Sequence, residues 1–175
     1  MKAYEVKPTQ NVSHLKMLVR YMAWANEITF KAVLSLPDDE ITKIRPTHFK
    51  TILSTLNHIY VINDVFRAHL EGQKHNYSAR NTATSPPINE LWDAFQKMDV
   101  RYIKITDELS DKELEQRIKF EFVDGGYGDM TRHEILSHII NHATYHRGFV
   151  SDMLNQANIS PEASDLPVFL RDVWN

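Results

Sequence analysis

Apolar residues recur every three to four positions along four long stretches of the chain, the spacing that puts them on one face of an α-helix. These stretches cover residues 13–36, 47–70, 86–110 and 131–158. Pro37 closes the first, and Gly72 follows the second at the place of a left-handed cap. Thr131 and Glu134 have the spacing of a capping box and open the fourth. The chain is therefore predicted to be all-α, with four long helices.

Between the third and fourth predicted helices, the helical period gives way to the alternation of a β-strand. Three apolar residues alternate there with charged or polar ones: Ile118, Phe120 and Phe122. The turn sequence Asp124-Gly125-Gly126 follows, and such a turn after an alternating segment is typical of a hairpin. Ser110 and Glu113, with capping-box spacing, predict a short helical turn just before it. We therefore predict a small β-hairpin inserted before the last long helix.

Four long amphipathic helices in one short chain pack most commonly as a four-helix bundle. With 175 residues, the chain can fill one core but is too short for two ordinary domains without a visible linker. Residues 1–175 are therefore expected to form a single domain. Near the C-terminus, the apolar segment Val168-Phe169-Leu170 is expected to dock as one helical turn.

The composition is that of a soluble globular protein, with 42% hydrophobic and 25% charged residues. No apolar run approaches the roughly 20 residues that a membrane helix requires, so no membrane partner is expected. Residues 1–6 lack the apolar segment and cleavage site of a signal peptide, which makes the cytoplasm the expected location. Lysine and arginine number 20 against 23 acidic residues and are scattered, a balance that argues against nucleic-acid binding.

Two histidines of the last predicted helix, His142 and His146, fall on its core-facing stripe. Histidines at positions i and i+4 lie one turn apart and can reach a single metal ion. Zinc-like ions usually need at least three protein ligands, and the chain contains no cysteine to supply a thiolate. His58 lies on an apolar arc of the second predicted helix, so the bundle allows it to meet the other two. The sequence thus predicts a metal site formed by His58, His142 and His146.

Two other interpretations of these histidines remain open. The rings could be core residues satisfied by hydrogen bonds alone, because buried imidazoles need partners of some kind. His138 lies one turn before His142, so His138, His142 and His146 form a rival set of ligands on one helix. Three successive turns spread along the helix axis and do not converge easily on one ion. We therefore favour His138 as a core residue or a neighbour of the ligands.

Several further residues border the predicted site. Asn141 and Tyr145 flank the ligands and could orient them or touch a substrate, although ordinary packing explains them equally well. Arg147 and Gly148 are interpreted as structural, since a glycine inside a helix costs about 1 kcal/mol relative to alanine unless another backbone or a dimer partner approaches it closely. The remaining histidines are expected at the surface or at helix caps: His14, His48, His69, His75 and His133.

Specific segments of the chain resemble the DinB/YfiT-like superfamily. They are Trp24-Ala25-Asn26, Leu56-Asn57-His58-Ile59, Leu136-Ser137-His138-Ile139 and Asn141-His142-Ala143-Thr144-Tyr145-His146-Arg147-Gly148. The resemblance covers nearly the whole chain and implies an up-down-down-up four-helix bundle that binds one divalent ion. It assigns the three ligands to His58, His142 and His146. Many members have Gln where Phe149 stands here, so a residue beside the site differs from the family pattern while all three ligands are kept.

The resemblance implies an enzyme that uses a low-molecular-weight thiol, as the bacillithiol-, glutathione- and mycothiol-dependent members do. Three neutral imidazoles leave the charge of a divalent ion uncompensated and leave coordination positions open, which is typical of a catalytic site. We therefore expect a metal-dependent S-transferase acting on a small-molecule substrate, with the sulfur supplied by the cosubstrate. A metal-dependent hydrolase and a non-catalytic metal-binding or sensing bundle are the alternatives.

The metal and the oligomeric state are less defined by the sequence. Nitrogen-rich sites accept zinc, nickel, iron or copper according to availability as much as geometry, so one divalent ion such as Zn, Ni or Fe is expected. Small bundles often pair through their helices, and a homodimer is accordingly expected without a definite contact patch.

Overall fold

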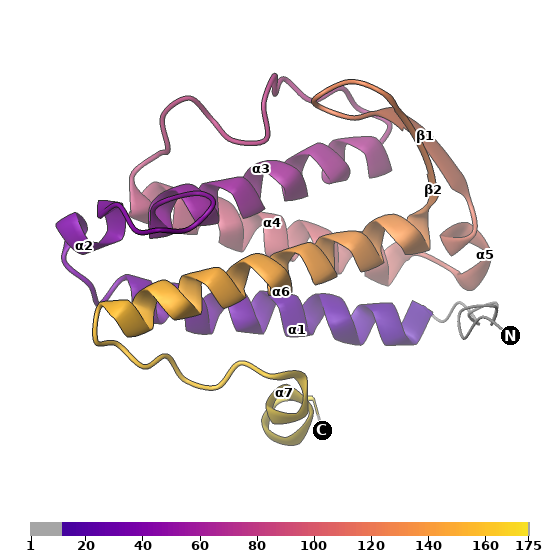
Figure 1. Ribbon diagram of the computed structural model, residues 1–175. Helices are drawn as coiled ribbons and strands as arrows, with labels where there is room; N and C mark the ends of the chain where they lie inside the picture. Colours follow the sequence, from indigo (N-terminus) through magenta and orange to yellow (C-terminus); the bar gives the residue numbers. More distant parts are fainter. Residues whose placement is uncertain (1–11, 175) are drawn as a thin grey trace, which may run out of the picture.

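The computed structural model describes residues 12–174, and four long helices form its bundle (Figure 1). They are α1 (Val12–Val33), α3 (Ile52–Leu70), α4 (Ile88–Glu108) and α6 (Arg132–Gln156). Helices α1 and α3 each pack against both α4 and α6, so the order around the bundle is α1, α4, α3, α6. The long connection 71–87 carries the chain back along the bundle, so α3 and α4 run in the same direction. The predicted all-α four-helix bundle is confirmed.

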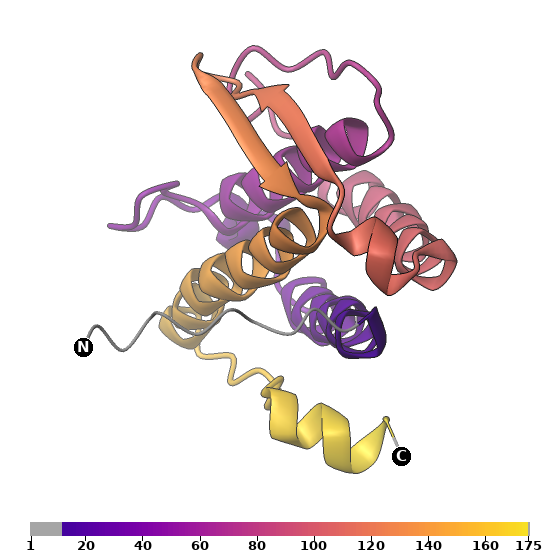
Figure 2. The same cartoon turned by 90° about the vertical axis from the view of Figure 1, so that its right-hand side faces the viewer.

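The shorter elements lie at the ends and on the outside of the bundle (Figure 2). They are α2 (Asp38–Thr42), α5 (Asp111–Leu114), β1 (Arg117–Glu121), β2 (Tyr127–Thr131) and α7 (Leu166–Asp172). Strands β1 and β2 form the predicted antiparallel hairpin, and Gly125 and Gly126 occupy its turn with φ of 91° and 86°. Both predicted capping boxes are present, Ser110 with Glu113 before α5 and Thr131 with Glu134 before α6. Within residues 12–174, none of the helices has the length and apolar character that crossing a membrane requires.

Some helix boundaries differ from those predicted. Helix α3 begins at Ile52 rather than near Thr47, because residues 47–51 form a turn in which Lys50 has a φ of 65°. The Thr51 side chain then caps α3 by accepting a hydrogen bond of 2.9 Å from the Ser54 N–H. The first helix ends at Val33, and residues 38–42 form a separate short helix with three acidic residues in its first turn. The C-terminal segment forms a seven-residue helix rather than a single turn.

A polar network crosses the bundle core between α1, α4 and α6. Arg147 is buried and donates hydrogen bonds to Asn26 Oδ1 at 3.0 Å and to Thr144 Oγ1 at 2.9 Å. The Asn26 amide donates in turn to the buried Asp99 carboxylate at 3.0 Å. The guanidinium also lies over the Tyr21 ring, 5.9 Å from its centroid. Asn26 therefore links a buried cation to a buried acid, and Arg147 has the structural role predicted for it.

The hairpin is held on the bundle by Phe120, which requires a glycine opposite it. Phe120 is buried, contacts the Phe66 ring of α3 and faces Gly128 across the two strands. A Cβ atom at Gly128 would collide with the Phe120 ring. At Gly148, by contrast, a Cβ would meet no described atom within 4 Å. The close approach of another backbone expected at Gly148 is therefore not found within residues 12–174.

Alanine substitutions at these two glycines are expected to have opposite effects on stability. Gly128→Ala should lower the free energy of unfolding by about 1–3 kcal/mol, because Phe120 must move off α3 to accept the new methyl group. Gly148→Ala should raise it by up to about 1 kcal/mol, because alanine is the better helix former and has room. Chemical denaturation of both variants measures these changes in the free energy of unfolding. A destabilised Gly148→Ala protein would contradict the open surface seen here and point to a partner chain at that face.

Candidate metal centre

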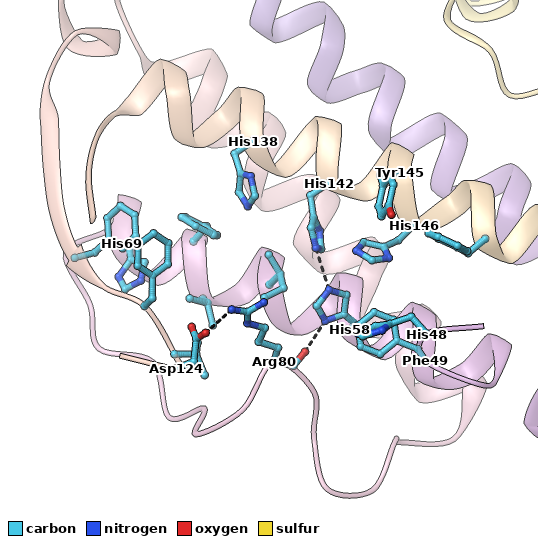
Figure 3. Close-up of a pocket in the computed structure, with 17 residues that line it drawn as sticks. His48, Phe49, His58, His69, Arg80, Asp124, His138, His142, Tyr145 and His146 are labelled. Atoms are coloured by element: carbon cyan, nitrogen blue, oxygen red, sulfur yellow. Dashed lines mark hydrogen bonds and ion pairs between the residues drawn. The ribbon is translucent and has the colours of Figure 1, made fainter. Parts of the chain in front are cut away.

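Three histidine rings from two facing helices meet at one point in the bundle (Figure 3). His58 comes from α3, and His142 and His146 come from successive turns of α6. One ring nitrogen of each lies within 4.8 Å of the others, and His58 Nε2 is 3.0 Å from His142 Nε2. Two imidazoles on one zinc-like ion keep their nitrogens about 3.0–3.4 Å apart, given metal–nitrogen bonds of about 2.0–2.1 Å. The structure therefore brings the three predicted ligands close enough together to hold one ion, and the His58–His142 pair has the spacing of two ligands of such an ion.

A main-chain contact determines which nitrogen of His58 carries its proton. His58 Nδ1 lies 2.7 Å from the carbonyl oxygen of Arg80, and a carbonyl can only accept a hydrogen bond. Neutral His58 therefore has its proton on Nδ1, which leaves the lone pair of Nε2 directed at the other two histidines. A metal-binding histidine usually makes such a bond through its second nitrogen, which fixes both the tautomer and the ring orientation.

All three rings have pKa values below that of free histidine. Burial, with the neighbouring histidines, lowers the pKa of His142 to about 3 and that of His146 to about 4. Burial also lowers the pKa of His58, against the opposing effect of its hydrogen bond to Arg80. The rings are therefore neutral at pH 7, the form that binds a metal ion. Nδ1 of His142 and Nδ1 of His146 are buried without a hydrogen-bond partner. The described protein groups therefore do not satisfy every ring nitrogen of the cluster.

A cavity of about 650 Å³ opens beside the three histidines and extends between α3 and α6 toward the hairpin. Its walls are largely apolar and include Phe49, Phe66, Phe120 and Phe149. Phe49 stacks on His58, with ring centroids 4.1 Å apart, and its edge meets His146 at 5.5 Å. Cavities of this size ordinarily receive small molecules. The candidate ligands thus lie in the wall of a chamber large enough for a substrate.

The comparisons with known proteins agree with this architecture. Residues 9–172 match the model of the DinB family. The chain belongs to the DinB family. Protein DinB of Bacillus subtilis (strain 168) is 28% identical over 160 residues, which cover 87% of this chain and 91% of that protein. The crystal structure of a DinB-like protein from Bacillus cereus ATCC 10987 has the same fold, with a TM-score of 0.63, 18% identity and coverage of 89% and 99% of the two chains.

Other residues singled out in this DinB-family chain lie at varying distances from the cluster. The His138 ring is 5.6 Å from the His142 ring and lines the cavity. Among the described histidines and acidic residues, the group close enough to share an ion is His58, His142 and His146, without His138. Tyr145 lines the cavity and is 63% exposed, whereas Asn141 is exposed and outside the cavity lining. Phe149 contributes to the apolar wall.

His48 is exposed, as expected, whereas the expected surface position is wrong for His69, and both residues line the cavity. His69 is only partly exposed and stacks on Phe120 with centroids 4.7 Å apart. Its Nε2 is buried without a hydrogen-bond partner. The hairpin covers His69, and a helical period alone does not reveal which polar positions an inserted hairpin will cover.

Sequence reasoning missed the residues that hold the loop against His58. The Asn57 amide donates to Thr82 Oγ1 at 2.7 Å and also to Asn81. Asn81 in turn donates to the Ser54 carbonyl at 3.0 Å, which ties residues 80–82 to α3. The available signal was Asn57 itself, a polar residue between Leu56 and His58. Its partners lie about 25 residues further along the chain and could not be identified from the pattern.

Proposed function

We propose that this DinB-family protein binds one divalent ion through His58, His142 and His146 and activates a low-molecular-weight thiol for S-transfer. The observation that carries the proposal is the meeting of three neutral imidazoles from α3 and α6 at the wall of an apolar cavity. A structural zinc site is usually closed by four protein ligands, whereas a three-ligand site leaves room for a small molecule. Zinc, nickel and iron all suit a site of this kind.

A divalent ion held there would lower the pKa of a bound thiol or water, so that thiolate or hydroxide becomes available near neutral pH. The protein's own residues prepare the site. The Arg80 carbonyl holds the His58 proton on Nδ1, and Phe49 and Phe149 contribute to the apolar wall beside the histidines. Because the chain contains no cysteine, the reacting sulfur must come from a cosubstrate. DinB-family membership supports a thiol in that role over water.

The test is conjugation of a thiol to a model electrophile such as chlorodinitrobenzene. Protein loaded with one equivalent of zinc, nickel or iron should form the thioether from glutathione or bacillithiol, with a carbon–sulfur bond replacing the carbon–chlorine bond and chloride and a proton released. Absorbance of the product measures the rate, and chelated protein is the control. Full metal occupancy without turnover across a panel of thiols and electrophiles would contradict S-transfer. Metal-dependent ester cleavage without thiol would favour a hydrolase instead.

A further inference from the structure

Two charged side chains, Arg80 and Asp124, face each other at the edge of the cavity (Figure 3). Arg80 belongs to the loop between α3 and α4, and Asp124 belongs to the turn of the hairpin. Arg80 Nη2 forms an ion pair with Asp124 Oδ2. Apart from this pair, the described lining consists of apolar, tyrosine and histidine side chains. The cavity therefore has a single guanidinium to distinguish a charged ligand from a neutral one.

The main chain of Arg80 is fixed while its side chain stays accessible. Its carbonyl accepts the hydrogen bond from His58, and the following residues are tied to α3 through Asn57. The Arg80 and Asp124 side chains nevertheless remain 60% and 57% exposed. The guanidinium thus extends from an anchored backbone, a short distance along the cavity from the candidate metal ligands.

The ion pair is of a kind that a ligand can replace. An exposed pair contributes only about 0–1 kcal/mol, because solvent screens both charges and two long side chains must be ordered. A guanidinium can bind a carboxylate through two parallel hydrogen bonds, and a buried or half-buried ligand strengthens such bonds. A ligand carboxylate can therefore take the place of Asp124 at little cost, while the body of the ligand gains contact with the aromatic walls.

We propose that Arg80 is a specificity-determining residue, and that the electrophilic substrate is an amphipathic carboxylate with an aromatic or aliphatic body. The body lies against Phe49, Phe66 and Phe120, and the carboxylate exchanges with Asp124 on the guanidinium. The assignment of the ligand as the electrophile rests on the proposed S-transfer. Carboxylate binding at Arg80 requires no metal and can be measured separately.

Calorimetric titration with phenylbutyrate and its neutral analogue phenylbutanol tests this assignment on zinc-loaded and on chelated protein. The wild type should bind phenylbutyrate about 10- to 100-fold more tightly, the difference expected for a charge-assisted hydrogen-bond pair. Arg80→Gln should abolish that preference while keeping the backbone carbonyl to His58, so its metal content should equal that of the wild type. Asp124→Asn should strengthen phenylbutyrate binding several-fold, because it removes the competing carboxylate.

The opposite signs of the two variants separate ligand recognition from a purely structural ion pair. If Arg80→Gln and Asp124→Asn weakened phenylbutyrate binding equally, or if the preference survived in Arg80→Gln, the assignment would be overturned. A preference seen only in zinc-loaded protein would also overturn it, because the carboxylate would then bind the metal. An Arg80-dependent preference in chelated protein supports the carboxylate site even if the S-transfer assay fails, so the two proposals can fail independently.

Discussion

His58→Ala and His146→Ala proteins are expected to lose their divalent ion, with metal affinity falling by more than the roughly 10- to 100-fold that loss of an outer-shell partner costs. His58 has the larger diagnostic value, because it is the ligand that α3 contributes and lies 84 residues from His142. Without it, only two adjacent turns of α6 remain. Elemental analysis of the purified proteins and competition with a chelator measure the change.

Two further histidine variants serve as matched controls for the loss of metal. His133→Ala changes a histidine in the first turn of α6 outside the cavity lining and should retain the ion. His138→Ala changes a cavity histidine that is not part of the three-ring cluster and should also retain it. Retention of metal by His58→Ala together with its loss from His138→Ala would show that the ligands lie on one helix and refute the site described here.

Arg147→Met is expected to be the most destabilising single change outside the metal centre, lowering the free energy of unfolding by about 3–5 kcal/mol at pH 8. The reason is that removal of one member of a buried charged network leaves the other without compensation. The remaining member is Asp99, whose carboxylate is buried and contacts Arg147 only through Asn26. A loss of this size is a large fraction of the stability of an ordinary domain.

The loss of unfolding free energy in Arg147→Met should become larger as the pH rises. Burial raises the pKa of Asp99 to about 7, although the Asn26 amide and the Arg147 charge act in the opposite direction. An acid whose pKa is higher in the folded state stabilises that state when protonated, so this contribution is full below about pH 4 and is lost as the pH rises through 7. Without Arg147, the pKa of Asp99 should rise further, so the free energy of unfolding should continue to fall at higher pH than in the wild type.

Denaturant unfolding at pH 5 and pH 8, with a chelator present in every sample, measures this pH dependence. The double variant Asp99→Asn/Arg147→Met should be more stable than Arg147→Met at pH 8, because it removes the uncompensated acid. Its free energy of unfolding should also lack the decrease with rising pH that ionisation of Asp99 causes in Arg147→Met. An equal deficit of Arg147→Met at both pH values would mean that Asp99 does not sense the Arg147 charge.

The fold was largely predictable because its determinants are local in the sequence. The apolar period located all four long helices, and the change to alternation at Ile118 located the hairpin. Both capping boxes form as their spacing predicts, since each joins residues only three positions apart. The start of the second long helix was misplaced near Thr47, because the apolar period continues through a turn that depends on the left-handed conformation of Lys50.

The meeting of the three histidines could be predicted, but most of their surroundings could not. His58, His142 and His146 lie on inward faces of helices that a bundle brings together. The Arg80 carbonyl, by contrast, comes from an irregular loop and lies 2.7 Å from His58 Nδ1. Every residue has a backbone carbonyl, so the residue type at position 80 does not predict this contact. The ion pair with Asp124 likewise depends on how the loop and the hairpin are placed on the bundle.

Anomalous diffraction from zinc-loaded crystals is the decisive test of the proposed metal centre, because it locates the ion and its ligands together. We expect one strong peak bonded to nitrogens of His58, His142 and His146, with its remaining coordination directed into the cavity. An ion bound elsewhere, or bound with the His58 ring turned away from the two α6 histidines, would contradict it.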